Sequence, residues 1–200
     1  AGSAGYDTTA FHPYKSSGWN RPIAYQDLGF DHQLYEEDVE DPYLIRHYIS
    51  DRSDYETVME TTRSANAAGQ KCFVFNVTMQ NHSGYSQGWN NLERTIDLPD
   101  QLKNADSSAI QYLALARASD DALKQLIEYY SQVEEPTMVV LFGDHQPPLK
   151  NAFYEELYGK ALSERTTEEV MKQYITPFFI WTNYEIEEQQ DVAVSPNYLG

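Results

Sequence analysis

Two side chains that could bind a metal ion stand next to each other after an apolar run. Residues 138–142 are apolar at every position, and Gly143, Asp144 and His145 follow. A short uninterrupted run of this kind is typical of a strand buried on both faces, as in a parallel sheet. A carboxylate and an imidazole are ligands that first-row divalent metals take. Asp144 and His145 are therefore a candidate half of a metal site; the alternative is a turn aspartate beside a surface histidine.

A third candidate, His82, follows another strand-like run. Residues 71–78 (KCFVFNVT) lead into the polar turn that contains it. Ligands bind at the carboxyl edge of parallel strands, so a shared parallel sheet would place His82 near Asp144 and His145. There an imidazole could donate to a phosphoryl oxygen or protonate a leaving group. An ordinary turn histidine is the alternative.

The loop at residues 12–22 has an unusual composition, because it contains His12, Lys15, Trp19 and Arg21. Arginine can bind a phosphate group through two nitrogens, and tryptophan offers a flat apolar wall. The loop is thus a candidate substrate-binding segment, although a solvated loop would have similar residues.

The charge distribution would suit an anionic substrate, although apolar strands contain few acids in any case. The 200 residues, enough for one domain or part of one, include 14 basic and 31 acidic side chains and have a net charge of −17. This balance argues against nucleic acid as a partner. Residues 8–26 and 61–92 contain no acid, and residues 136–154 contain only Asp144. If these segments met in the fold, they would form a region that an anion could approach.

The elements that would position these residues follow from apolar patterns and capping signals. We expect strands at residues 6–11, 71–78, 138–142 and 177–182, and helices at residues 23–30, 43–49, 54–68, 104–130, 152–158 and 166–173. Asp41-Pro42 would begin the second helix, and a capping box of Ser53 and Glu56 the third. The crossover through the long helix predicts that strands 71–78 and 138–142 are parallel. The fold class is α/β, a mostly parallel sheet flanked by helices. No apolar stretch approaches the roughly 20 residues of a membrane span, and the single Cys72 cannot form an internal disulfide.

Four motifs in order resemble the lipoteichoic acid synthase family, which comprises phosphoglycerol transferases of the alkaline phosphatase and sulfatase superfamily. They are GYDTTAFHPYKSSGWNRPIAYQDLGFD, FNVTMQNHSGY, TMVVLFGDHQPPL and TPFFIWTNY, and together they span nearly the whole chain. The resemblance implies an alkaline-phosphatase/sulfatase-like fold. It also implies that Asp144 and His145 are two of four ligands of one divalent ion, usually Mn²⁺, with Mg²⁺ or Zn²⁺ as alternatives. His82 would be catalytic, near the phosphate and its leaving group.

The same resemblance assigns His12, Trp19 and Arg21 to binding of the phosphoglycerol group. One position departs from the family pattern: the acid expected two residues after the loop histidine is Tyr14 here. The transferred group could therefore differ from phosphoglycerol. The substrate would be a phospholipid head group or a glycerophosphate polymer.

The family's threonine nucleophile and glutamate ligand have no counterpart in this sequence. We therefore expect residues 1–200 to be a single partial domain, the carboxyl-terminal part of a catalytic domain, soluble and inactive alone. The upstream part of the same polypeptide would complete the site in a membrane-anchored parent at the extracellular face of the bacterial membrane. Alternatives are a phosphoethanolamine transferase, phosphodiesterase or sulfatase of the same superfamily, or a non-catalytic envelope module that binds an anionic polymer.

Overall fold

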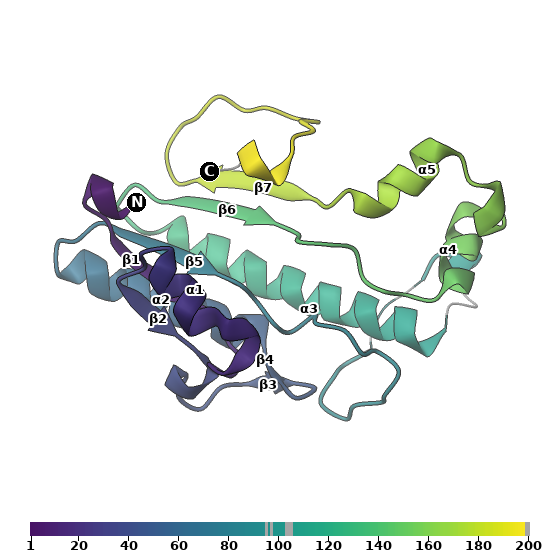
Figure 1. Ribbon diagram of the computed structural model, residues 1–200, viewed down its shortest axis with the longest axis horizontal. Coiled ribbons are helices and arrows are strands. Elements are labelled where there is room, and N and C mark those ends of the chain that lie inside the picture. The colour runs from purple at the N-terminus through teal and green to yellow at the C-terminus, as the bar shows by residue number, and fades with distance from the viewer. Residues whose placement is uncertain (95, 97, 103–105, 199–200) are drawn as a thin grey trace.

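A three-stranded parallel sheet lies toward one side of the computed structural model, which describes residues 1–94, 96, 98–102 and 106–198 (Figure 1). Its order is β2 (His32–Leu34), β1 (Asp7–Phe11), β5 (Cys72–Asn76). Asp7 pairs with Cys72 and Phe11 with Asn76, so the two longer strands end together. β1 and β5 confirm predicted strands, whereas β2 is too short and too polar to be predicted.

Helices cover both faces of this sheet. On one face, Tyr25 of α1 (Arg21–Asp27) packs with Ala10 and Phe75. On the other, α2 (Asp51–Ala67) contacts β5 and packs along α3 (Ser107–Tyr130), the long helix in Figure 1. Successive strand residues point to opposite faces, so Phe75 faces α1 while Asn76 bonds to Asp54 of α2. The α/β class with a parallel sheet flanked by helices is confirmed.

The strand before Asp144 belongs to a separate sheet. β6 (Met138–Phe142) pairs antiparallel with β7 (Phe178–Thr182), and no described strand joins them to β5. Val139 and Trp181 pack against a cluster formed by α2 and α3, while Met138, Val140 and Phe142 are exposed. The predicted strand is confirmed, but its expected burial on both faces is wrong, and among the described strands residues 138–142 lie in a different sheet from residues 71–78. The handedness rule for crossovers applies only to strands of one sheet.

Residues 43–49 form a hairpin instead of the predicted helix. Its strands are β3 (Leu44–Ile45) and β4 (Tyr48–Ile49), and Arg46 between them has a φ of 60°. Asp41 also has a positive φ, 44°, and no helix follows it before α2. The capping box at Ser53 is wrong as well, because Ser50 caps α2 and the Ser53 hydroxyl accepts a bond from the Tyr43 N–H instead.

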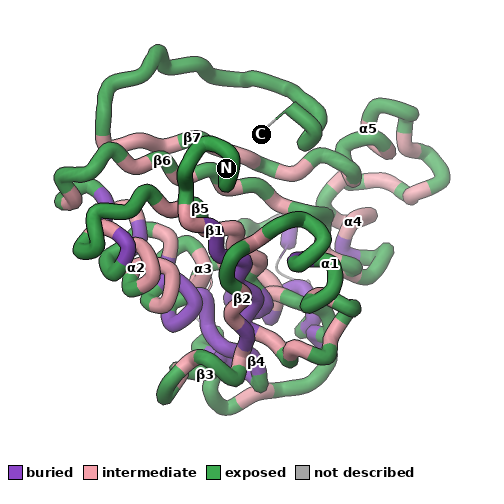
Figure 2. Tube along the Cα trace, turned by 60° about the vertical axis from the view of Figure 1, so that its left-hand side comes forward, coloured by how far each residue is buried: buried purple, intermediate pink, exposed green. Residues whose placement is uncertain are grey.

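The remaining helices lie outside the parallel sheet. α4 (Asn151–Tyr158) and α5 (Thr167–Met171) lie together at one end of the molecule (Figure 1). Short 3-10 helices span Gly2–Ala4, Gly18–Asn20, Glu36–Asp38, Asp100–Leu102, Leu162–Glu164, Lys172–Tyr174 and Pro196–Tyr198. The predicted start of the long helix at residue 104 lies outside the described residues. Buried residues are concentrated in β1, α2 and α3, whereas the residues after β7 are exposed (Figure 2). No helix among the described residues is long and apolar enough to cross a membrane.

Candidate active site

His12 lies directly after the central strand β1 and is almost fully buried, with 1% of its surface exposed. Its backbone N–H donates to the carbonyl of Leu34, and its Nδ1 lies 2.7 Å from the carbonyl oxygen of Val77. Because a carbonyl can only accept, Nδ1 must carry the proton. Nε2 is then an acceptor, and this buried atom has no partner among the described residues.

The His12 imidazole is neutral at physiological pH. Burial lowers its pKa to about 4, although the bond to Val77 acts in the opposite direction. Positive charge on Arg21 and His82 lowers the pKa further. His12 therefore offers a lone pair to a ligand and suits a substrate hydroxyl better than a phosphate oxygen.

Trp19 and Arg21 are placed by an unusual stretch of backbone. Trp19 and Asn20 have φ values of 52° and 55°, a conformation that is rare for residues other than glycine. α1 starts immediately after them, and the guanidinium carbon of Arg21 lies 5.1 Å from the centre of the Trp19 ring. Arg21 Nη1 donates to the Tyr25 hydroxyl, whereas its buried Nε has no partner among the described residues.

His82 is exposed at the end of β5, in a turn held by Arg46. The buried guanidinium of Arg46 donates to three carbonyl oxygens of this turn, those of Gln80 (2.6 Å), His82 (2.8 Å) and Gly84 (3.2 Å). Hydrogen bonds from a charged donor are the stronger kind. Arg46 therefore fixes the backbone that carries His82.

Five rings from three segments meet at the carboxyl end of β1 and β5, and we call them the ring cluster: His12, Tyr14, Trp19, Tyr48 and His82. Trp19 lies at its centre, 5.7 Å from His12, 5.4 Å from Tyr14 and 6.0 Å from His82 between ring centroids. The Tyr48 hydroxyl lies 3.4 Å from Nδ1 of His82. The structure thus brings together four of the six residues predicted for the site, His12, Trp19, Arg21 and His82.

Two buried aspartates of α2, Asp51 and Asp54, bond to α3 and to the segment from β5 to His82. The Asp51 N–H donates to the side-chain oxygen of Gln80 (2.9 Å), and the Ser119 hydroxyl donates to the Asp51 carboxylate. Asn76, the last residue of β5, donates to Asp54. Burial raises the pKa of Asp51 to about 6 and that of Asp54 well above its usual value. Neither carboxylate was singled out by its sequence context, which is an ordinary helix start.

Asp144 and His145 follow β6 and are exposed. The His145 N–H donates to Asp144 Oδ1 (2.8 Å), and Thr176 donates to the carbonyl of Gly143 (2.8 Å). A Cβ added to Gly143 would come within 3.1 Å of Thr176 Cβ, so this turn packs closely against the strand leading into β7. Within the part of the chain that the structure describes, no bond, ion pair or ring contact joins this pair to the ring cluster.

The Asp144–His145 pair fits half of a divalent metal site. One oxygen and one nitrogen ligand stand side by side with most of their side-chain surface free. The described residues include no group of three or more potential His, Cys, Asp or Glu ligands. Within the described part of the chain, the pair therefore offers two ligands and no third one beside them.

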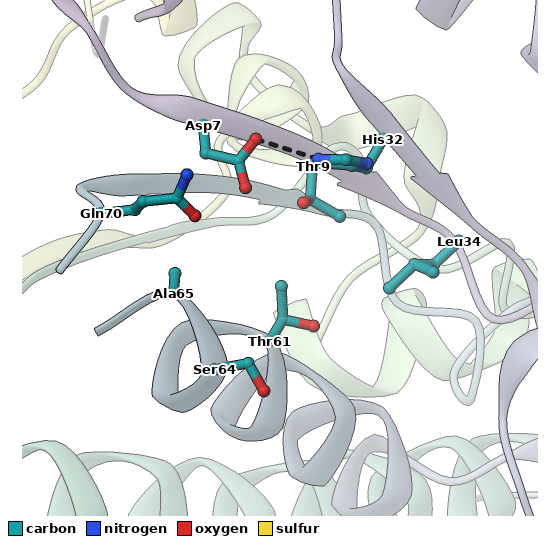
Figure 3. A pocket seen from close by; sticks show the side chains of 8 residues that line it. All are labelled: Asp7, Thr9, His32, Leu34, Thr61, Ser64, Ala65 and Gln70. Atoms are coloured by element: carbon teal, nitrogen blue, oxygen red, sulfur yellow. Dashed lines mark hydrogen bonds and ion pairs between the residues drawn. The ribbon is translucent and has the colours of Figure 1, made fainter. Parts of the chain in front are cut away.

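A separate cavity of about 310 Å³ lies between β1, β2 and the second half of α2 (Figure 3). Asp7 Oδ1 and His32 Nε2 lie within hydrogen-bond distance (3.0 Å) at its edge, and Thr61, Ser64 and Gln70 add polar atoms. It lies toward the amino end of β1, whereas His12 follows the carboxyl end. None of the predicted site residues lines it.

Sequence patterns missed Arg46 and Tyr48. Asp41-Pro42 imitates a helix start, and no glycine or asparagine marks the hairpin turn, so no local signal reveals either residue. The acid-poor segments 8–26 and 61–92 do meet, at the ring cluster. No described contact brings segment 136–154 to the same place.

A family model described as Sulfatase matches residues 1–200. A protein of Rhizobium meliloti (strain 1021), provisionally named for cyclic beta-1,2-glucan modification, is 29% identical over 200 residues, covering 98% of this chain and 31% of the relative. The chain therefore spans about a third of that relative's length.

Two solved structures share the fold. The phosphoglycerol transferase GacH of Streptococcus pyogenes, in complex with sn-glycerol-1-phosphate, aligns with a TM-score of 0.68 and 23% identity, over 93% of this chain and 46% of GacH. The lipoteichoic acid synthase LtaP of Listeria monocytogenes aligns with a TM-score of 0.71 and 23% identity, over 90% of this chain and 44% of LtaP. At this level of identity they establish the alkaline-phosphatase/sulfatase-like fold.

Proposed function

Because this chain belongs to the sulfatase family, we propose that the longer protein containing it is a metal-dependent transferase of the bacterial cell envelope. It moves phosphoglycerol, or a related phospho-head group, from a lipid donor to an acceptor. The observation that carries this proposal is the ring cluster with Arg21, assembled at the carboxyl end of parallel strands, where α/β proteins bind ligands. The protein would act at the extracellular face of the membrane.

A head group that combines a phosphate with hydroxyls matches the groups at the cluster. Arg21 supplies a positive charge for the phosphate, and its Nε is left unpaired within the described residues. His12 Nε2 accepts from a hydroxyl, and Trp19 provides an apolar wall. The bound sn-glycerol-1-phosphate of GacH has both kinds of group and supports this assignment.

His82 is the residue we assign to proton transfer or to stabilising charge on a phosphoryl oxygen. It is exposed to an approaching substrate, and its backbone is fixed by Arg46. The Tyr48 hydroxyl near Nδ1 orients the ring, which leaves Nε2 for the substrate. Catalysis of this kind depends on such orientation.

Asp144 and His145 would hold a divalent ion, Mn²⁺ in our proposal, with Mg²⁺ or Zn²⁺ as alternatives. When bound, such an ion neutralises charge on a phosphoryl group and activates a nucleophile. Two ligands are too few for tight binding, so the upstream part of the polypeptide is needed to complete the site. We expect the 200-residue chain alone to be inactive.

The relative named for cyclic glucan modification supports an envelope glycan as the acceptor. The Tyr14 side chain, which stands where the resembling family has an acid, packs between Trp19 and Tyr48. Because a hydroxyl-bearing ring replaces a carboxylate beside Trp19, we propose as an alternative that the transferred head group is not glycerol phosphate.

The test is a calorimetric Mn²⁺ titration of the whole extracellular region, together with release of glycerol phosphate from phosphatidylglycerol. Wild type should bind one ion and release the head group, and Asp144→Asn should weaken both by at least tenfold because an anionic ligand is lost. The matched control is Asp120→Asn, an exposed carboxylate on α3, which should change neither. Hydrolysis of sulfate esters without release of a phospho-head group would instead identify a sulfatase. Metal binding unaffected by Asp144→Asn would remove Asp144 from the site.

A further inference from the structure

The row of rings continues beyond His82 to a pair of residues that the proposed function does not use. Tyr48 lies 6.0 Å from His82 and only 4.0 Å from His47, and His47 lies 5.0 Å from Trp89. We call His47 and Trp89 the ring platform. His47 is exposed and Trp89 is half-buried.

The platform is held in place by specific bonds between distant segments. Asn91, two residues after Trp89, donates to the carbonyls of Leu44 (3.1 Å) and Arg46 (2.9 Å) and accepts from the Arg46 N–H (3.2 Å). These three bonds attach the loop with Trp89 to the hairpin with His47. Trp89 also packs against the apolar cluster around Leu115. The two rings are therefore positioned before any ligand arrives.

The chemistry of the platform favours a neutral ligand. Burial, with Arg46 and His82 nearby, lowers the pKa of His47, which favours the uncharged ring. Both Nη atoms of Arg46 donate to backbone carbonyls, three bonds in all, and its Nε is buried. The exposed His47 ring and the half-buried Trp89 ring thus offer apolar surface beside an Arg46 side chain whose Nη atoms are bonded to backbone carbonyls.

We propose that His47 and Trp89 form an acceptor subsite on which a neutral sugar ring of a glycan packs, next to His82. The apolar face of a sugar ring suits a flat aromatic surface, while its hydroxyls remain in water or reach polar neighbours. The row Trp19, His82, Tyr48, His47, Trp89 places this sugar along a continuous path from the head-group site. This inference rests on the proposed function and names its acceptor class.

Binding provides the first test, because it needs neither metal nor lipid donor. A linear β-1,2-linked gluco-oligosaccharide is titrated calorimetrically into the intact protein. We expect Trp89→Ala to weaken binding about tenfold, while Trp89→Phe stays within about threefold because it keeps a ring. Tyr174→Ala, which removes a ring that is 76% exposed and outside the row, should have no effect.

His47→Ala serves as the second variant, since the exposed His47 can be removed even if Trp89→Ala folds poorly; it should weaken glucan binding in the same direction. Unchanged affinity in His47→Ala and in a folded Trp89 variant would overturn the proposal. A glycerol phosphate oligomer that binds more tightly than the glucan, in a Trp89-dependent manner, would overturn it too.

Activity separates this inference from the proposed function. If wild type releases no head group, the proposed function fails, whatever the glucan titration shows. If release is normal but the KM for the glucan acceptor is the same in wild type and His47→Ala, only the acceptor subsite is wrong. The expected result is unchanged donor release with a raised acceptor KM.

Discussion

At the scale of single residues, the candidate site depends on which atoms are left without partners. His12 uses Nδ1 for the Val77 carbonyl and keeps Nε2 free, and Arg21 keeps Nε free in the same way among the described residues. Burying an unpaired polar group costs stability, on the order of 1–3 kcal/mol. Such groups are therefore expected where a ligand supplies the missing partner.

We predict that His12 stays neutral, with its proton on Nδ1, from pH 8 down to about pH 5. Its folded pKa of about 4 lies below the value of 6.5 of a free histidine, so the unfolded chain takes up the proton first. Because of His12, the free energy of unfolding therefore decreases as the pH falls from 6.5 towards 4, by up to about 3 kcal/mol. Nitrogen-15 NMR of the imidazole measures the pKa and the tautomer of His12, with a short peptide around His12 as the control. A His12 signal that titrates together with the peptide would contradict the burial argument.

Arg46 gives a second prediction at this scale. Arg46→Met keeps much of the side-chain volume but leaves three carbonyls without their donor, so we expect a loss of about 3 kcal/mol or more in the free energy of unfolding. Urea denaturation of the intact protein measures it. The control is Arg52→Met, which removes an exposed pair with Glu56 and should cost less than about 0.5 kcal/mol. Equal losses in both variants would mean that the Arg46 bonds add nothing beyond surface contacts.

At the scale of elements, the first turn of α2 links helix, strand and site through Asp51 and Asp54. Both pKa values are raised above the unfolded value, so rising pH removes protons from the unfolded chain first and destabilises the fold. Asp54→Asn carries no such charge. Its stability relative to wild type should increase as the pH rises from about 4 towards neutrality, because the unfolded wild-type carboxyl ionises first.

Thermal or urea unfolding across this pH range measures the difference between Asp54→Asn and wild type. Asp120→Asn, on the exposed face of α3, should parallel wild type at every pH. A difference between Asp54→Asn and wild type that is constant with pH would show that the Asp54 carboxyl titrates alike in the folded and unfolded chains.

Sequence patterns predicted elements well where the signal was local and strong. β1, β5, β6, β7 and α3 follow from apolar runs or a helical stripe, and each lies close to its expected bounds. The hairpin at residues 43–49 could not be predicted, because tertiary bonds from Asn91 and the left-handed Arg46 decide its shape. Strand pairing could not be predicted either, since an apolar run indicates a strand but not the strand beside it.

At the scale of the whole molecule, two sheets share one helical layer. α2 and α3 cover one face of the parallel sheet and one face of β6–β7. The predicted substrate residues His12, Trp19, Arg21 and His82 all belong to the first sheet and its loops, which explains why acid-poor segments could indicate their meeting. Asp144 and His145 belong to the second sheet. Their distance from the ring cluster depends on how the sheets are arranged, which no residue pattern encodes.

The outer face of β6–β7 bears on how the chain behaves in solution. Met138, Val140, Phe142 and Ile180 expose between 36% and 53% of their surface there. A contiguous apolar face on a strand pair promotes association with other copies or with other apolar surfaces. Dilution and added charge on that face would then govern how much of the 200-residue chain stays monomeric, regardless of whether its site is intact.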